Sequence, residues 1–457
     1  TPGYADFIGE AIGSLRVADF AAVVVHAGHG VEVGTEQVWE YATNYNIPKM
    51  IILNALDKEN LNINEVMEQI KERFGNKVFA MTLPIKVGPG FNQVVNVLSK
   101  KLITYQTDGS GKYSEEDLSG EWKEKVDLLH EELIELVAES DDSLLEKFFE
   151  HGGLSEEEMC TGIHAAVQSE SVTPLFATSG ETNVGVSHVM DFIAKYGSSP
   201  VDRKEVKGIN EKDEETTIAL DNNEPVAFVF KTMSEPQIGE LSFFRLYSGK
   251  IEPGMTLFNS SRRKDERFGQ TFVLNGKNRD AVATLHAGDI GAVVKLKDTH
   301  TNNTLCDYKK VVALPKIEYP KPNIHAAVKS KAKGDEEKMG IGLAAIHEED
   351  PTFIFKGDPE LHQMVISGQG ELHLMVVINR LRSKFKLEID VSEPKIPYRE
   401  TIKANGNSKY RHRKQSGGAG QFAEVWMRIM PLTKKDDEVE FTQSLVGQNV
   451  DRVFVPS

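Results

Sequence analysis

Residues 18–57 read ADFAAVVVHAGHGVEVGTEQVWEYATNYNIPKMIILNALD and predict one strand–helix–strand unit. The apolar run at 18–27 has the length of a buried strand, and residues 34–46 have helical spacing. Pro48 interrupts the chain before a second apolar strand at 50–53. A crossover of this kind joins parallel strands, and ligands of such sheets bind beyond the carboxyl ends of the strands.

Two loops are candidates for reading a guanine base at that edge. Asn54 and Asp57 directly follow the second strand. A carboxylate there can accept both the ring and the exocyclic N–H donors of guanine, a pattern that adenine does not present. Ser179 and Gly180 follow a later strand-like run and can offer a backbone N–H to a base carbonyl. Taken alone, the Asn54 and Asp57 pattern is better explained by an ordinary turn, and Ser179 and Gly180 cannot be distinguished from one. Their position at the ends of parallel strands favours the functional interpretation.

The chain opens on Thr1, Pro2, Gly3 and Tyr4, followed by a predicted amphipathic helix at 6–17. Pro-Gly is common turn chemistry and carries little information alone. A flexible glycine before a helix N-terminus can, however, follow a terminal phosphate and move when that phosphate leaves. These residues are therefore candidates for sensing a γ-phosphate.

The composition restricts the class of protein. The chain has 457 residues, 40% hydrophobic and 27% charged, and at about 150 residues per domain it predicts three or more domains. A formal charge of −16 argues against a DNA-coating protein, although local basic patches can still contact RNA. We expect a cytoplasmic location, because the chain has only two cysteines. It also has no apolar run of membrane length, and its first residues do not have a signal-peptide pattern.

The texture of the sequence changes several times along the chain. We expect a partial α/β nucleotide-binding domain with a helical insertion, followed by a charged linker at 202–221 and a β-barrel. A β-α-β-β-α-β domain comes next, and the chain then enters a further α+β domain. The insertion contains acidic helices over 114–149 and a serine-capped helix at 155–167. The predicted ranges are 1–201 with the insertion at about 86–170, 205–318, 322–396 and 397–457.

A basic run near the end of the chain is a candidate RNA contact. Lys409, Arg411, Arg413 and Lys414 are followed by a glycine loop that includes Gly417 and Gly418. Positive charge beside a loop with little side-chain bulk suits phosphate contacts, and a solvated hairpin explains the run equally well. No metal site is predicted, because His362 and His373 lack ligand spacing with carboxylates on one helical face and fit packing or surface positions.

Taken together, these motifs resemble those of the elongation factor G family. Residues 1–7 (TPGYADF) and 14–19 (SLRVAD) resemble the second switch of translational GTPases. Further similar segments are 367–374 (SGQGELHL), 397–401 (PYRET) and 415–421 (QSGGAGQ). The segments at 332–339 and 409–415 are most similar to the elongation-factor-G-like paralogues found beside the main factor in some bacteria.

The resemblance implies a monomeric, multidomain GTPase that binds GTP or GDP with Mg²⁺ and acts on the ribosome. It implies contacts with rRNA, ribosomal proteins and the tRNA–mRNA complex, coupling hydrolysis to translocation, and no membrane or DNA partner. By this analogy Asn54, Asp57, Ser179 and Gly180 bind guanine, the opening loop senses the γ-phosphate, and the insertion meets the ribosomal stalk. The barrel meets the small subunit, the β-α-β-β-α-β domain relays rearrangement, and the last segment begins a tRNA-mimicking domain.

Three departures from the family pattern bear on catalysis. The 457 residues contain no Gly-x-x-x-x-Gly-Lys-Ser/Thr loop, so we expect the chain to be a fragment that is inactive alone. Tyr4 stands where the family has a water-positioning histidine, and a phenol with a pKa of about 10 is a poor base. Ala55 stands where the family has a lysine whose stem packs on the base, so nucleotide affinity is expected to be weaker.

Two functions remain open on this basis. The first is a translocating GTPase in the intact protein, with catalysis assisted from the position of Tyr4. The second is a ribosome-binding paralogue that hydrolyses GTP weakly or not at all and serves recycling or protection of the ribosome from an antibiotic. Tyr4 and Ala55 favour the second.

Overall fold

A computed structural model describes the chain apart from residues 236–238, 399, 416, 419, 433–439 and 448–457. Arg399, Ser416 and Ala419, which belong to motifs quoted above, therefore lie outside the described residues, as do parts of the expected fourth domain. The chain divides into two units, residues 1–394 and 395–457, which are described separately.

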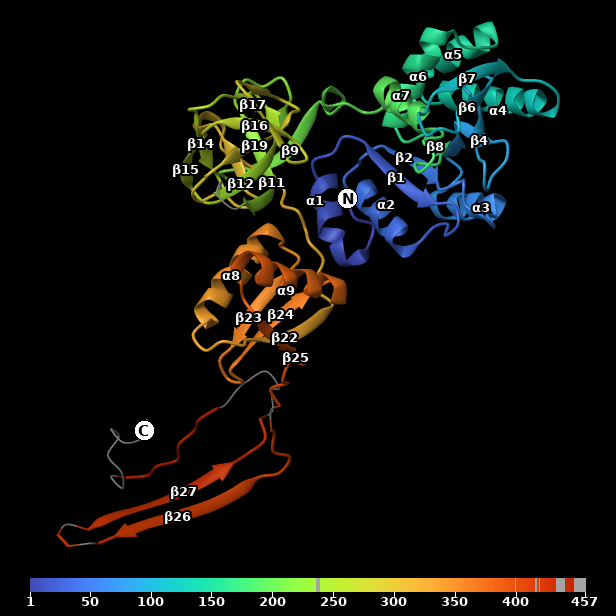
Figure 1. Ribbon diagram of the computed structural model, residues 1–457. Helices are drawn as coiled ribbons and strands as arrows, with labels where there is room; N and C mark the ends of the chain where they lie inside the picture. Colours follow the sequence, from blue (N-terminus) through green and yellow to red (C-terminus); the bar gives the residue numbers. More distant parts are fainter. Residues whose placement is uncertain (236–238, 399, 416, 419, 433–439, 448–457) are drawn as a thin grey trace. The chain divides into compact units, whose positions relative to one another are not determined.

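The predicted strand–helix–strand unit is confirmed. β1 (Ala21–His26), α2 (Val33–Asn44) and β2 (Lys49–Asn54) form a crossover with parallel strands, in a register that pairs His26 with Asn54. β8 (Thr173–Ala177) and β3 (Val78–Ala80) complete a parallel sheet in the order β1-β2-β8-β3 (Figure 1). Because the strands are parallel, their carboxyl ends share one edge of the sheet.

Side chains of this sheet alternate between two hydrophobic clusters, one on each face. Ile51 and Leu53 pack in one cluster with α3, and Met50 and Phe176 pack in the other with α4, α6 and α7. The helices are α3 (Ile63–Phe74), α4 (Glu121–Ala138), α5 (Asp142–His151), α6 (Glu156–Gln168) and α7 (Val186–Tyr196). The predicted serine cap is confirmed, since Ser155 and Glu158 form a reciprocal capping box at the start of α6.

Two details of the first domain were predicted wrongly. The run at 78–83, whose apolar residues predict a single strand, is two short strands, β3 and β4 (Thr82–Pro84), which belong to different sheets. The insertion is not helical throughout: β5 (Gln93–Asn96), β6 (Lys101–Tyr105) and β7 (Tyr113–Asp117) form an antiparallel sheet with β4. The acidic sequence of β7 favoured a helix, but the strand is an exposed edge held by its pairing with β6.

The second part of the first unit is built on an antiparallel sheet of eight strands in the order β15-β14-β20-β11-β12-β19-β16-β17. Its interior is a buried cluster that includes Val229, Phe244 and Leu257. Its strands are β11 (Val226–Glu235), β12 (Gly239–Ser248), β14 (Thr256–Asn259), β15 (Lys264–Arg267), β16 (Thr271–Asn275), β17 (Asn278–Val282), β19 (Ile290–Val294) and β20 (Thr304–Cys306). β13 (Lys250–Ile251) and β18 (Leu285–His286) pair separately as a two-stranded sheet. This barrel-like sheet was predicted from the short alternating runs.

The charged stretch at 202–221 is not simply a linker. After η2 (Pro200–Asp202), β9 (Glu205–Asn210) and β10 (Glu215–Ala219) form an antiparallel hairpin. β21 (Val312–Ala313), which follows η3 (Tyr308–Lys310), pairs with β9 and makes a three-stranded sheet. The periodicity argument missed these strands because Ile218 is the one buried side chain of β10, which leaves no repeated apolar alternation in the sequence.

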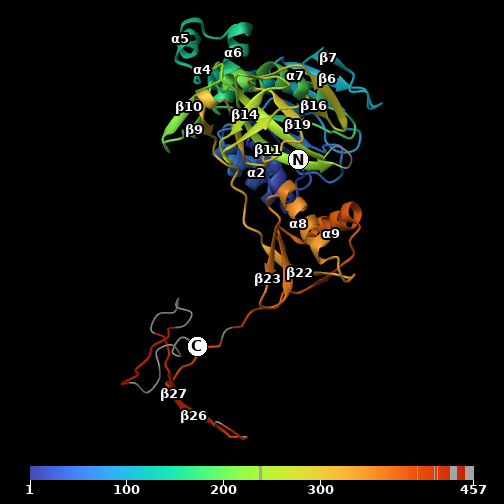
Figure 2. The same cartoon turned by 90° about the vertical axis from the view of Figure 1, so that its left-hand side faces the viewer.

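The β-α-β-β-α-β prediction is confirmed in element order and topology. β22 (Ile324–Ser330), α8 (Glu336–Glu349), β23 (Ile354–Asp358), β24 (Gln363–Gly368), α9 (Glu371–Phe385) and β25 (Ile389–Ser392) give the sheet order β23-β24-β22-β25. Both helices cover the same face of this sheet (Figures 1 and 2). We call residues 322–394 the split βαβ domain.

The second unit contains one hairpin among its described residues. β26 (Gly406–Lys414) pairs antiparallel with β27 (Gln421–Ile429), so the basic run lies on a strand and the glycine loop connects the two strands. In the part of the chain that the structure describes, no helix is long and apolar enough to cross a membrane.

Candidate functional site

The loops after β2 and β8 are bonded to each other at the carboxyl edge of the parallel sheet. The Asn54 side-chain oxygen accepts hydrogen bonds from the Gly180 N–H at 2.8 Å and from the Thr178 hydroxyl at 3.3 Å. The Leu56 N–H donates to the Thr178 carbonyl at 3.2 Å. Asn54 is therefore a brace that fixes one loop against the other.

Asp57 lies in the same group of residues. Its carboxylate accepts from the Ser179 hydroxyl at 2.6 Å, and the Lys58 ammonium lies 3.2 Å from its second oxygen. Burial raises the pKa of Asp57, but the bonds from Ser179 and Lys58 outweigh burial and leave that pKa below its usual value. A carboxylate has about four acceptor positions, so these two contacts leave capacity for two donors from a planar base. The residues present thus fit a guanine.

The backbone at Ala55 is unusual. Its φ of 68° lies in the left-handed region, which costs a non-glycine residue roughly 1 kcal/mol. The turn is closed by the Lys58 N–H, which donates to the Ala55 carbonyl at 3.2 Å. Strain of this kind persists where surrounding bonds over-determine a conformation, and here those bonds hold Asn54 and Asp57 on either side of it.

The opening loop is held differently. Thr1, Pro2, Gly3 and Tyr4 are exposed, with 71% of the Tyr4 surface accessible. The Gly3 carbonyl lies beside the start of α2, so close that a Cβ at Gly34 would stand 3.0 Å from it. Because α2 follows the carboxyl end of β1, the loop lies toward the edge that carries Asn54. Among the described residues no hydrogen bond or ion pair joins the two loops, so their convergence on one nucleotide stays a prediction.

The helix that follows the opening loop contacts the split βαβ domain. η1 (Ala5–Phe7) leads into α1 (Ile8–Leu15), and the Asp6 carboxylate accepts from the His373 N–H at 3.1 Å. His373 is the third residue of α9, whose own cap, Gly370, has no side chain to offer. Asp6 thus supplies an N-terminal capping carboxylate from another part of the chain. A Cβ at Gly370 would lie 2.3 Å from an Asp6 oxygen, so a side chain there would displace the Asp6 carboxylate.

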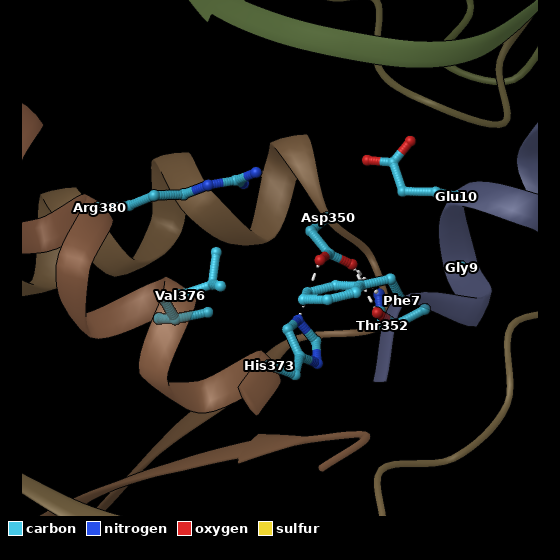
Figure 3. A pocket seen from close by; sticks show the side chains of 9 residues that line it. Phe7, Gly9, Glu10, Asp350, Thr352, His373, Val376 and Arg380 are labelled. Atoms are coloured by element: carbon cyan, nitrogen blue, oxygen red, sulfur yellow. Dashed lines mark hydrogen bonds and ion pairs between the residues drawn. The ribbon is translucent and has the colours of Figure 1, made fainter. Parts of the chain in front are cut away.

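A pocket lies between η1, α1 and the split βαβ domain (Figure 3). His373 is buried in it: its Nδ1 accepts from the Gln369 N–H at 3.0 Å, which leaves Nε2 to donate to Asp350 at 3.0 Å. Burial raises the pKa of Asp350, yet the bonds from His373 and Thr352 hold that pKa below its usual value. The packing position expected for His373 is confirmed, and the sequence alone did not reveal its role in positioning Asp350.

The end of α1 contacts the barrel through residues that the sequence analysis did not single out as functional. The Arg16 guanidinium donates to the Tyr247 hydroxyl at 3.0 Å, and Arg245 donates to Asp19 at 2.7 Å. Arg245 is only 2% exposed. A lone arginine inside the apolar run of β12 is a usable signal, because a buried guanidinium requires a partner.

Among the described residues, no strand pairs with the outer side of β1. β1 is the terminal strand, and Val24 near its centre is 58% exposed. Parallel strands are normally covered on both faces, so an exposed valine in mid-strand marks a surface suited to further packing.

The basic run of the second unit has two faces. The alternation of β26 places Lys409, Arg411 and Arg413 on one side, and Lys414 on the other. Arg411 pairs with Glu424 across the hairpin, and Lys409 lies over the Trp426 ring at 4.9 Å. Gly417 and Gly418 both have positive φ in the connecting loop.

Comparison with known proteins bears directly on this arrangement. Four family models match consecutive parts of the chain: the elongation factor Tu GTP-binding domain over 1–199, elongation factor G domain 2 over 224–308, domain III over 319–393 and domain IV over 394–457. The chain belongs to the elongation factor G family.

A solved structure agrees with this membership of the elongation factor G family. A crystal structure of a Thermus thermophilus protein is 31% identical in sequence, with a TM-score of 0.81 over 94% of the present chain. The present chain spans 62% of the length of that protein. These matches confirm the multidomain fold class that the sequence predicted.

Proposed function

We propose that the intact protein is a guanine-nucleotide-binding translation factor that acts on the ribosome in the cytoplasm. The observation that carries the proposal is the hydrogen bond from the Gly180 N–H to Asn54, which fixes Asp57 and Ser179 in one group at the carboxyl edge of a parallel sheet. Asn54 and Asp57 then select guanine, and Ser179 and Gly180 hold their loop in place.

Phosphate binding and hydrolysis require groups beyond this cluster. The open edge of β1, with Val24 exposed, is where a further strand carrying a phosphate-binding loop would pair. Thr1 to Tyr4 would sense the γ-phosphate, and Mg²⁺ bound with GTP would neutralise charge during phosphoryl transfer. Asp6 and Phe7, which contact His373, would pass movement of this loop to the split βαβ domain.

The second unit supplies the proposed contact with RNA. Lys409, Arg411 and Arg413 share one face of an exposed hairpin, and Lys414 lies beside the glycine loop. This arrangement suits phosphate oxygens of rRNA or of the tRNA–mRNA complex. We propose that the protein acts as a monomer that couples hydrolysis to tRNA–mRNA movement.

The decisive experiment is GTP turnover by the intact protein with and without ribosomes. Ribosome-stimulated turnover is expected, and nucleotide binding without any stimulated turnover contradicts the enzymatic part of the proposal. Substitution Asp57→Asn should abolish the stimulation at limiting GTP. The control Asp213→Asn, in the turn between β9 and β10, should leave the stimulation intact.

A second candidate function has its own support. Tyr4 replaces the histidine that the family resemblance implies, and its ring is exposed rather than held by a hydrogen bond to another described side chain. A phenol is a weak base, which favours a ribosome-binding paralogue with slow or absent hydrolysis, serving recycling or protection. Turnover of Tyr4→His separates the two: a large increase indicates a weakened enzyme, and no change indicates that catalysis is absent for other reasons.

A further inference from the structure

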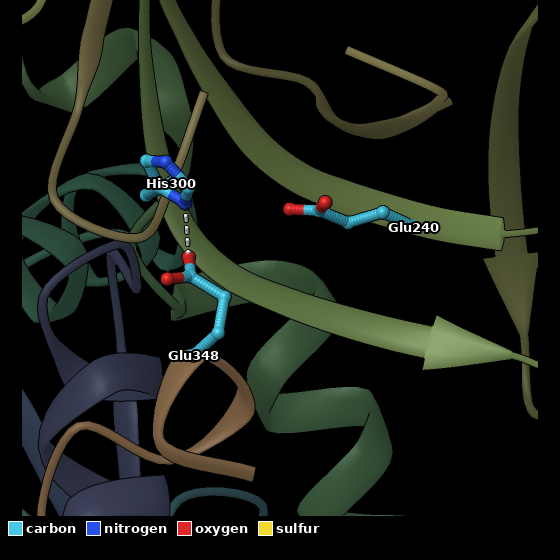
Figure 4. A group of neighbouring side chains, drawn as sticks. All are labelled: Glu240, His300 and Glu348. Carbon is cyan, nitrogen blue, oxygen red and sulfur yellow. Dashed lines mark ion pairs between the residues drawn. The ribbon is translucent and has the colours of Figure 1, made fainter. Parts of the chain in front are cut away.

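Three side chains from distant parts of the chain meet where the barrel contacts the split βαβ domain. Glu240 lies near the start of β12, His300 in the loop between β19 and β20, and Glu348 in the last turn of α8. One possible ligand atom from each lies within 4.8 Å of the other two. The Glu240 carboxylate points toward the other two side chains (Figure 4).

The hydrogen bonding of this cluster is incomplete. His300 Nδ1 and a Glu348 oxygen form an ion pair at 2.7 Å. The Glu240 Oε1 atom is buried and has no hydrogen-bond donor in the described structure. The Glu240 side chain is half-buried, and its ligand atom lies within 4.8 Å of that of Glu348. Two neighbouring carboxylates in such a place are costly to ionise together unless a cation accompanies them.

The backbone around the cluster is well fixed. The His300 N–H donates to Asn303 at 3.1 Å, and the preceding residue, Thr299, is bonded to Glu266. The Glu348 carbonyl accepts from the Thr232 hydroxyl at 2.8 Å. Both sides of the cluster are therefore positioned by groups outside it, and only side-chain rotation is needed to change its internal distances.

We propose that Glu240, His300 and Glu348 form a binding site for one divalent transition-metal ion of the Zn²⁺ class, which bridges the barrel and the split βαβ domain. Two carboxylates and one imidazole suit Zn²⁺, whereas Mg²⁺ and Ca²⁺ prefer oxygen ligands alone. Ligand atoms in a tetrahedral site with bonds of about 2.1 Å lie about 3.4 Å apart. The His300–Glu348 pair, now 2.7 Å apart, must therefore open slightly, and the Glu240 carboxylate, whose ligand atom lies within 4.8 Å of the other two, needs at most a small shift. Water would complete the coordination.

A bound ion resolves both irregularities of the cluster. Its charge of +2 offsets the two carboxylates, and it gives the Glu240 Oε1 atom a partner. It also connects strand β12 to helix α8 next to Asp350, which holds His373. The site is separate from the proposed nucleotide edge, so its test does not depend on nucleotide binding.

The experiment is calorimetric titration of ZnCl₂ into chelator-stripped intact protein, with millimolar Mg²⁺ and a non-thiol reductant present. Saturable binding of one ion is expected, with an increase in melting temperature. Glu240→Gln keeps the size of the side chain but replaces one ligand oxygen with an NH2 group and removes the charge, so it should weaken binding at least about tenfold. His164→Gln, at the matched His164–Asp202 pair with its 3.0 Å contact, should leave binding unchanged.

A rival site exists at His26 and His29, whose rings are stacked 4.3 Å apart. Binding that survives Glu240→Gln but disappears in His29→Gln would assign the ion to those histidines and overturn the proposal. Equal affinity of Glu240→Gln and the unaltered protein, or no saturable binding at all, would overturn it as well. His300→Gln provides a second ligand variant, and its folding is checked by circular dichroism against Glu240→Gln.

Discussion

The loop after β2 and the loop that opens the chain belong to the same candidate site, yet they are held in opposite ways. The first is braced by side-chain bonds from Asn54 and Asp57 to the loop after β8. The second is exposed, and its fixed point lies after it, where Asp6 contacts α9. The part that would recognise the base is thus held by side-chain bonds, whereas the part that would sense the phosphate is solvent-exposed as far as η1.

The largest expected effect comes from removing the acceptor that selects the base. Asp57→Asn replaces one carboxylate oxygen with an N–H donor and keeps the other as an amide oxygen, so one hydrogen bond to guanine is lost. Bonds to charged groups contribute about 1.5–3 kcal/mol each, which predicts a loss of GDP affinity of about 10-fold to 150-fold. Fluorescent-nucleotide binding by the intact protein measures it.

The same variant has an internal control. Xanthine presents a carbonyl where guanine presents its exocyclic amine, so Asp57→Asn should gain affinity for xanthosine diphosphate as it loses affinity for GDP. Equal weakening toward both nucleotides would mean that the residue supports the fold of the loop rather than reading the base.

A smaller effect is expected when the brace itself is weakened. Ser179→Ala removes the 2.6 Å bond to Asp57 and should cost about 1–2 kcal/mol of unfolding free energy, because a charge-assisted bond is lost. Chemical denaturation at pH 7 measures it, with Ser171→Ala on the same domain as control, since the Ser171 hydroxyl bonds to the neutral Ser169 hydroxyl in an exposed turn.

The pH dependence sharpens this prediction. The pKa of Asp57 is lower in the folded state than in the unfolded state. The ionised carboxylate therefore contributes fully to the free energy of unfolding above the unfolded pKa near 4, and this contribution is lost as the pH falls through the lower folded pKa. The difference in stability between the parent and Ser179→Ala should therefore be constant from pH 7 to about pH 5 and shrink below about pH 4. A difference that persists unchanged at pH 2 would contradict the role of the ionised carboxylate.

The contrast between the loops also explains what the sequence could and could not predict. Asn54 and Asp57 were found because a local strand–helix–strand pattern places them at a strand end, and local patterns are readable. Asp6 and His373 are 367 residues apart, and Arg245 and Asp19 are 226 apart, so their pairing depends on how whole domains pack. Strand β7 was missed because its acidic residues are exposed and only its pairing with β6 makes it a strand.

The helix behind the opening loop provides the next test. Asp6→Ala removes the carboxylate that caps α9 and should destabilise the contact by about 1 kcal/mol, typical of a lost N-cap. Faster amide hydrogen exchange at residues 371–374 is the specific measurement. Asp117→Ala, at an exposed surface pair with Lys101, is the matched control and should leave that exchange unchanged.

Gly370→Ala tests the same contact from the other side. The added Cβ would stand 2.3 Å from the Asp6 carboxylate and should displace it. Exchange at the start of α9 should then rise in Gly370→Ala as it does in Asp6→Ala, and the double variant should add little, because both remove one interaction. Fully additive effects would show that the two residues act separately.

The smallest effect on stability is expected in the exposed opening loop. Tyr4→Phe removes only the hydroxyl of a residue that is 71% exposed. The free energy of unfolding should therefore change by less than about 0.5 kcal/mol. Any effect on GTP turnover would then arise from chemistry rather than from stability. If the hydroxyl positions water, Tyr4→Phe slows ribosome-stimulated turnover while nucleotide affinity stays constant. A loss of stability as large as that of Ser179→Ala would instead show that the opening loop is as firmly held as the loop after β2, and the contrast between them would fail.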